Sequence, residues 1–122
     1  MKKIFLLIPL IMFGIDYHSY KDAVKKAKEL HKPVMIEITS SHCHYCKWME
    51  STTLQDKEVV SFIQKNFIPV RIDVSKEEIP KGIEYSMTPT FIFMDPKGRI
   101  IKKIPGAWKK EDFLKILKEV KE

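Results

Sequence analysis

A chain of 122 residues is long enough for one domain with one hydrophobic core, and a hydrophobic content of 44% suits a globular fold. The formal net charge of +6 comes from lysines scattered along the chain, whereas a nucleic-acid-binding surface needs clustered basic residues with aromatic platforms. These bulk properties argue against a nucleic-acid partner and leave both an enzyme and a protein-binding module open.

The first segment differs from the rest of the chain. Two lysines precede an uncharged apolar run over residues 4–14, which is the pattern of a secretory signal peptide. The run is too short to cross a bilayer comfortably as a helix, but its Met-Phe-Gly end lacks the usual cleavage pattern. We therefore expect residues 1–15 to be a signal peptide or a membrane anchor, and residues 16–122 to fold in an exported compartment, where disulfides persist.

Helical and strand patterns alternate after this leader. Ser19 and Asp22 have the spacing of a helix-capping pair, and Asp56 is a suitable first residue for a later helix. Helices show apolar residues at a spacing of three and four, and strands are short apolar runs between turn signals. The sequence predicts a helix from Ser19 towards Pro33, a strand over 33–38, a helix over 43–50 and a helix after Asp56. It then predicts a strand over 67–74, a connector over 75–86 with room for one helical turn, a hairpin of strands 88–95 and 99–104, and a last helix through Phe113 and Val120.

This order of elements predicts an α/β fold. Strands that alternate with helices pair in parallel first, and the hairpin around Asp95 to Gly98 adds an antiparallel edge. We expect a central mixed sheet of about four strands, flanked by helices, in the order αβαβ followed by ββα.

The only two cysteines, Cys43 and Cys46, lie three positions apart where a strand gives way to a helix, and His42 and His44 flank the first of them. At a helix start such a pair lies on one face, within about 6 Å at Cα, close enough for a disulfide. The pair could be a redox centre, part of a metal site or a structural disulfide. Four ligands within five residues cannot easily surround one ion, and so small a ring constrains little of the unfolded chain, so a redox centre is favoured.

The helix start predicts different roles for the two cysteines. Unpaired N–H groups and the helix dipole favour a thiolate at Cys43, which makes it the attacking sulfur. Cys46 lies one turn further in and would resolve the mixed disulfide. If Glu37 is buried nearby, it can take the Cys46 proton; a structural ion pair with Arg71 is the alternative. His44 either stabilises the thiolate or is an exposed side chain with little effect.

The element order and these motifs resemble the thioredoxin fold over about residues 17–122. Cys43-His44-Tyr45-Cys46 matches the redox motif of that family, and Thr88-Pro89 stands where its members carry a cis-proline loop facing the cysteines. Gly106-Ala107 stands where they have a small residue beside the substrate groove, and Glu37 where they have a buried acid. The resemblance implies catalytic roles for Cys43, Cys46 and Glu37, an active-site environment of His42, His44 and Tyr45, and substrate binding by Thr88, Pro89 and Gly106.

Departures from ordinary thioredoxins narrow the resemblance. His44 and Tyr45 replace the Gly-Pro between the cysteines, and His42 replaces the usual tryptophan before them. Tyr45 together with Thr88 resembles bacterial periplasmic disulfide isomerases. The chain is most similar to small exported bacterial thioredoxin-like proteins, which implies a periplasmic or otherwise exported location, with residues 4–14 as a possible membrane anchor.

The resemblance implies a thiol–disulfide oxidoreductase whose own Cys43–Cys46 disulfide is the redox group, with no other cofactor and no metal. Reduction of protein disulfides is the favoured direction, with a membrane thiol-transfer protein as the electron source and a monomeric chain. Two alternatives stay open. One is a disulfide oxidase or isomerase-like protein, for which the membrane protein is an electron sink, and the other is a non-enzymatic metal-binding or chaperone module.

Overall fold

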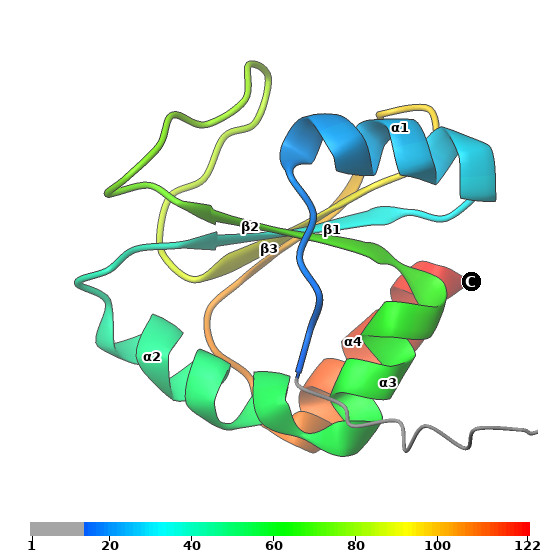
Figure 1. The fold of residues 1–122 in the computed structure, drawn as a ribbon. Coiled ribbons are helices and arrows are strands. Elements are labelled where there is room, and N and C mark those ends of the chain that lie inside the picture. The colour runs from blue at the N-terminus through cyan, green and yellow to red at the C-terminus, as the bar shows by residue number, and fades with distance from the viewer. Residues whose placement is uncertain (1–13) are drawn as a thin grey trace, which may run out of the picture.

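The computed structural model describes residues 14–122, in which four strands form one sheet in the order β2-β1-β3-β4 (Figure 1). Strands β1 and β2 are parallel, whereas β3 is antiparallel to β1 and β4 is antiparallel to β3. The predicted central mixed sheet is therefore confirmed. The strands are β1 (Val34–Thr39), β2 (Ile68–Asp73), β3 (Thr90–Met94) and β4 (Ile100–Pro105).

Helices cover both faces of the sheet (Figure 1). Helix α1 lies on one face, and α2, α3 and α4 lie on the other. The sheet is thus the middle layer of three, as expected for a sheet with parallel and crossover connections. The helical elements are α1 (Tyr20–Leu30), α2 (His44–Ser51), the short 3-10 helix η1 (Thr53–Gln55), α3 (Lys57–Asn66) and α4 (Lys110–Lys121).

Strand β1 is buried along its whole length because it lies inside the sheet with helices on both faces. Side chains alternate between the two faces of a strand, so Ile36 packs with the alanines of α1, and Met35 packs with the phenylalanines beneath α3 and α4. Glu37 is the charged residue in this apolar run. By the same alternation it lies on the Met35 face, the face covered by α2.

Local signals determine where the helices begin. The Ser19 hydroxyl accepts a hydrogen bond from the Asp22 N–H at 3.2 Å, as predicted for a cap. The Asp56 carboxylate caps α3 in the same way, accepting from the N–H groups of two residues in its first turn. The end of α1 differs from the prediction: the helix ends at Leu30, before Pro33, because His31 takes a left-handed conformation with φ 54°.

The segment between β2 and β3 consists mainly of turns and bends, and it begins with one helical turn, in which the Asp73 carbonyl accepts from the Glu77 N–H at 3.0 Å. The single helical turn considered for the connector over 75–86 is therefore present at its start. The leader predicted over residues 1–15, with its apolar run over 4–14, lies outside the described residues except for its last two positions. Across residues 14–122, no helix has the length and apolar character needed to cross a membrane.

Candidate active site

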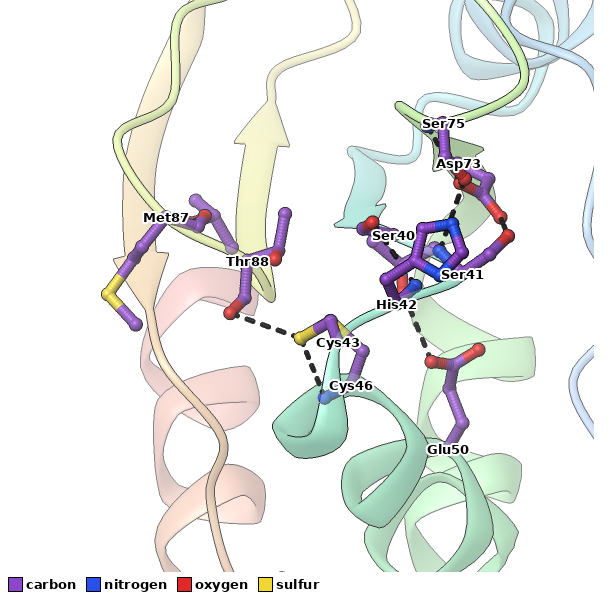
Figure 2. The surroundings of a disulfide bond; sticks show 12 residues. Ser40, Ser41, His42, Cys43, Cys46, Glu50, Asp73, Ser75, Met87 and Thr88 are labelled. Atoms are coloured by element: carbon purple, nitrogen blue, oxygen red, sulfur yellow. Dashed lines mark hydrogen bonds between the residues drawn. A yellow bond between two sulfur atoms is a disulfide. The ribbon is translucent and has the colours of Figure 1, made fainter.

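Cys43 and Cys46 form a disulfide at the beginning of α2, with their Cα atoms 5.2 Å apart (Figure 2). Cys43 is the N-cap residue of the helix, and its Sγ accepts a hydrogen bond from the Cys46 N–H at 3.1 Å. Cys46 is fully buried, whereas Cys43 is only partly buried. The pair is therefore asymmetric: one sulfur is accessible at a helix start, where backbone donors are unpaired, and the other is shielded.

The Thr88–Pro89 loop faces the accessible cysteine (Figure 2). Cys43 Sγ lies 3.4 Å from the Thr88 carbonyl oxygen, and the Thr88–Pro89 peptide bond is cis. The Gly106 N–H donates to the Pro89 carbonyl at 2.8 Å, and Gly106 has a φ of 95°, which favours glycine. The structure thus brings Thr88, Pro89 and Gly106 together on one side of the cysteine pair.

Exposed side chains surround the disulfide. His42 and His44 are both exposed, and 70% of Tyr45 is open to solvent. These three side chains are exposed next to the cysteine pair, and their role in the environment of the site stays a prediction. An effect of His44 on the Cys43 thiolate stays a prediction.

Hydrogen bonds fix the loop that precedes Cys43 to the end of β2 (Figure 2). The Ser41 hydroxyl donates to Asp73 Oδ2 at 2.5 Å, and the Ser41 N–H donates to Ser75 Oγ at 3.2 Å. Ser75 donates to Asp73 Oδ1 through its N–H, at 2.9 Å, and through its hydroxyl. The Ser41 and Ser75 hydroxyls stabilise the carboxylate and lower the pKa of Asp73 to about 2.

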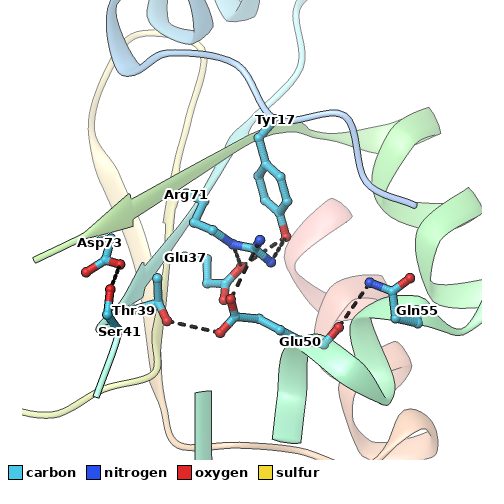
Figure 3. A network of polar contacts seen from close by, with 8 residues as sticks. All are labelled: Tyr17, Glu37, Thr39, Ser41, Glu50, Gln55, Arg71 and Asp73. Carbon is cyan, nitrogen blue, oxygen red and sulfur yellow. Dashed lines mark hydrogen bonds and ion pairs between the residues drawn. The ribbon is translucent and has the colours of Figure 1, made fainter. Parts of the chain in front are cut away.

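A second polar network surrounds Glu37, which is fully buried (Figure 3). Its Oε1 accepts hydrogen bonds from the Tyr17 hydroxyl and from Arg71 Nε, both at 3.0 Å. Arg71 also donates to the Tyr17 oxygen at 2.8 Å and lies over the Tyr17 ring, with its Cζ 4.2 Å from the ring centre. Arg71 Nη1 is 3.6 Å from Glu50 Oε1, and the Thr39 hydroxyl donates to the other Glu50 oxygen at 3.1 Å.

The pKa of Glu37 lies nearer to neutral pH than that of an ordinary glutamate. Burial raises the pKa of Glu37 to about 6, although the neighbouring Arg71 guanidinium lowers it. Burial likewise raises the pKa of Tyr17, so the phenol remains a donor. Within residues 14–122, Glu37 Oε2 is buried and has no hydrogen-bond partner. The ion pair with Arg71, considered as the alternative role for Glu37, is present, and it leaves one carboxylate oxygen free.

The sequence did not predict several polar residues of the site. Glu50 lies four positions after Cys46 on the same helix face, so a local signal for it was present. Ser41 follows the end of β1 and Asp73 ends β2, but their contact depends on how the segments after these strands meet. Tyr17 had no such signal, because the segment before α1 shows neither helical nor strand periodicity.

Comparison with known proteins agrees with this geometry. Residues 20–121 match the thioredoxin-like domain family. Thiol:disulfide interchange protein DsbD of Campylobacter jejuni is 32% identical over 106 residues, covering 82% of this chain and 18% of that protein. Disulfide bond reductase DsbH of Chlamydia pneumoniae is 25% identical over 115 residues, covering 81% of this chain and 69% of that protein. The solution structure of a thioredoxin from Thermus thermophilus superposes with a TM-score of 0.74 and 28% identity, covering 88% of this chain and 87% of that one.

A three-layered α/β fold, with a cysteine pair opening a helix opposite the Thr88–Pro89 loop, defines a thioredoxin-like protein. The match over residues 20–121 shows that this chain belongs to the thioredoxin-like domain family. The chain spans 9% of Spermatogenesis-associated protein 20 of Rattus norvegicus, to which it is 32% identical over 75 residues, and so corresponds to a small part of such relatives.

Proposed function

We propose that this chain is an exported thiol–disulfide oxidoreductase that reduces protein disulfides with the Cys43–Cys46 pair. The observation that carries the proposal is the asymmetry of that pair. Cys43 is accessible at the N-cap of α2, beside the Thr88 carbonyl, and Cys46 is fully buried one turn away. A purely structural disulfide would need no such difference between its two sulfurs.

The reaction begins with the reduced dithiol. The Cys43 thiolate attacks one sulfur of a substrate disulfide, forms a mixed disulfide and displaces the first substrate thiolate. Cys46 then loses its proton and attacks Cys43 Sγ, which closes the intramolecular disulfide and displaces the second substrate thiolate. Two electrons pass to the substrate, and its two thiolates each take up a proton. The Cys46 N–H, which donates to Cys43 Sγ, stabilises negative charge on Cys43.

Glu37 acts as the proton acceptor for Cys46 in this scheme. Both side chains are fully buried, and Glu37 lies on the sheet face that α2 covers. The unpartnered Oε2 is available for a proton, and a pKa of about 6 lets the carboxylate accept and release that proton near neutral pH. Arg71 and Tyr17 hold the other oxygen, so the carboxylate keeps its orientation through the cycle.

Similarity to a disulfide bond reductase supports the reducing direction. Electrons would come from a membrane thiol-transfer protein, because the leader over residues 1–15 predicts a location outside the cytoplasm. The reduction potential distinguishes the two directions. It is about −270 mV for reductases of this fold and about −120 mV for strong oxidants. Equilibration of the pair with glutathione buffers should give a value on the reducing side, and a value near the oxidants would assign the opposite direction.

Trapping variants test the roles of the two cysteines. In Cys46→Ser, Cys43 still attacks partner disulfides but the product is not resolved, so mixed disulfides should accumulate as reducible high-mass bands. In Cys43→Ser, the remaining thiol is shielded, so few bands and no turnover are expected. Equal trapping by both variants, or trapping by Cys43→Ser alone, would contradict the proposed roles. The trapped proteins would also identify the substrates.

A further inference from the structure

An apolar pocket with a volume of about 410 Å³ opens beside the cysteine pair, between α2 and the segment that joins β4 to α4. Tyr45 lies between the two cysteines and is 70% exposed, and Trp48, one helical turn from it, is 41% exposed. Exposed aromatic side chains that line a shared pocket mark an interaction site. The pocket is lined by His44, Tyr45, Trp48, Ala107 and Lys109.

The charge of this pocket is positive and is not neutralised by the protein. Within residues 14–122, Lys109 makes no ion pair, whereas the adjacent Lys110 lies 3.2 Å from Asp56 and 3.4 Å from Glu58. Among the described residues, no acidic side chain lines the pocket. An apolar pocket with one free cation at its rim complements an apolar side chain that has an acidic neighbour.

A second pocket is lined by charges of both signs. It is smaller, about 280 Å³, and is lined by both Glu84 and Lys103 together with Thr90, close to the Thr88–Pro89 loop. Lys103 Nζ donates to the Glu84 carbonyl at 2.9 Å, which holds its ammonium group beside Glu84. The unbalanced positive charge therefore lies at the pocket beside Trp48.

We propose that this pocket binds an apolar side chain of the substrate protein, with an adjacent acidic residue placed at Lys109, so that disulfides in apolar, acidic segments are reduced preferentially. The inference rests on the proposed function, because the pocket acts on a substrate whose disulfide lies at Cys43. The pocket contributes to binding and orienting the substrate segment, and the chemistry of the two cysteines is unchanged.

Peptides with one disulfide test the proposal on the full-length reduced chain. Three peptides carry Leu-Asp, Leu-Lys or Gly-Asp next to the reactive cysteine and are otherwise identical. An exposed ion pair contributes up to about 1 kcal/mol, so kcat/KM should be about three- to fivefold higher for Leu-Asp than for Leu-Lys. In Lys109→Glu this preference should reverse. The variant should fold normally, because an acidic residue is favourable at the beginning of a helix.

Two controls separate this effect from general changes of charge or reactivity. Lys97→Glu makes the same charge change in the turn between β3 and β4, at the other end of the sheet, and should leave the peptide preference unchanged. The small neutral hydroxyethyl disulfide has no side chain for the pocket, so its rate in each variant measures the reactivity of the cysteines alone, and the peptide rates of each variant are divided by it. Trp48→Ala should lose the preference for Leu-Asp over Gly-Asp while still preferring Leu-Asp to Leu-Lys.

The outcomes distinguish this inference from the proposed function. Equal reduction of all three peptides by the wild type, or an unchanged preference in Lys109→Glu, would overturn the pocket's role and leave the oxidoreductase activity standing. The same shift in Lys97→Glu would also overturn it. Failure of the wild type to reduce both the peptides and hydroxyethyl disulfide would contradict the proposed function itself.

Discussion

Glu37 and Asp73 are carboxylic acids in the C-terminal halves of two neighbouring parallel strands, and their surroundings shift their pKa values in opposite directions. Burial raises the pKa of Glu37 to about 6, while hydrogen bonds from two serine hydroxyls lower the pKa of Asp73 to about 2. Register pairs Glu37 with Arg71 and Thr39 with Asp73, so the two acids lie on the same face, two positions apart along the strands.

The number of donors on each carboxylate explains the difference. Asp73 is partly exposed, and both of its oxygens accept hydrogen bonds, from Ser41 and from Ser75. Glu37 has no exposed surface, and only one of its oxygens has partners. A carboxylate that is fully hydrogen-bonded keeps its charge and holds a loop in place, whereas one that is buried and half-satisfied can exchange a proton near neutral pH.

The largest effect is expected for Glu37→Gln on turnover. Glutamine keeps the shape of the side chain and cannot accept a proton, so the rate of insulin reduction at pH 7 should fall on the order of 10- to 100-fold. The wild-type rate should rise as pH passes through about 6, because the acceptor works when deprotonated, and this step should be absent from the variant. Reduction rates measured from pH 5 to pH 8 check the prediction; matching profiles would reject Glu37 as the acceptor.

Stability should respond to Glu37 over the same pH range. Because burial raises its pKa from 4.5 to about 6, the folded state binds more protons than the unfolded state, and stability falls as pH rises between these values. The loss amounts to about 2 kcal/mol, since one pKa unit corresponds to about 1.4 kcal/mol. Urea unfolding of the oxidised protein at pH 4.5 and pH 7 should show this loss in the wild type and not in Glu37→Gln. An equal loss in both would assign it to another group.

The sequence predicted the features of the site that arise from local structure. A cysteine at a helix start, a buried strand that carries one acid, and a proline directly before a strand can each be identified from neighbouring residues. The Glu37–Arg71 ion pair could also be predicted, because two adjacent parallel strands place these residues opposite each other.

Contacts that depend on an irregular segment could not be predicted. Tyr17 reaches Glu37 because the segment before α1 lies beside β2, where the His18 N–H donates to the Pro69 carbonyl at 2.9 Å. No residue type or spacing before α1 indicates that position. The Asp73 hydrogen bonds likewise require the loop after β1 and the turn after β2 to meet, which follows from their three-dimensional path and not from a periodic pattern.

The smallest effect is expected for Asp73→Asn. Asparagine keeps one acceptor oxygen, so the loop before Cys43 loses only the hydrogen bonds to the oxygen that becomes an amide nitrogen. The folded pKa of Asp73, about 2, lies below its ordinary value of 3.8, so its stabilising effect is complete above pH 3.8 and disappears as pH falls through about 2. Solvent screens this partly exposed group, so the effect should be smaller than that of Glu37. The difference in urea midpoint between wild type and variant should therefore be constant from pH 7 to pH 4 and narrow towards pH 2.

In the reduced protein at pH 7, the looser loop should also let iodoacetamide modify Cys43 a few-fold faster. Ser41→Ala, which removes one donor to Asp73, should produce part of the same change. Wild-type alkylation rates in both variants, with no change in acid stability, would show that these hydrogen bonds do not position the attacking cysteine.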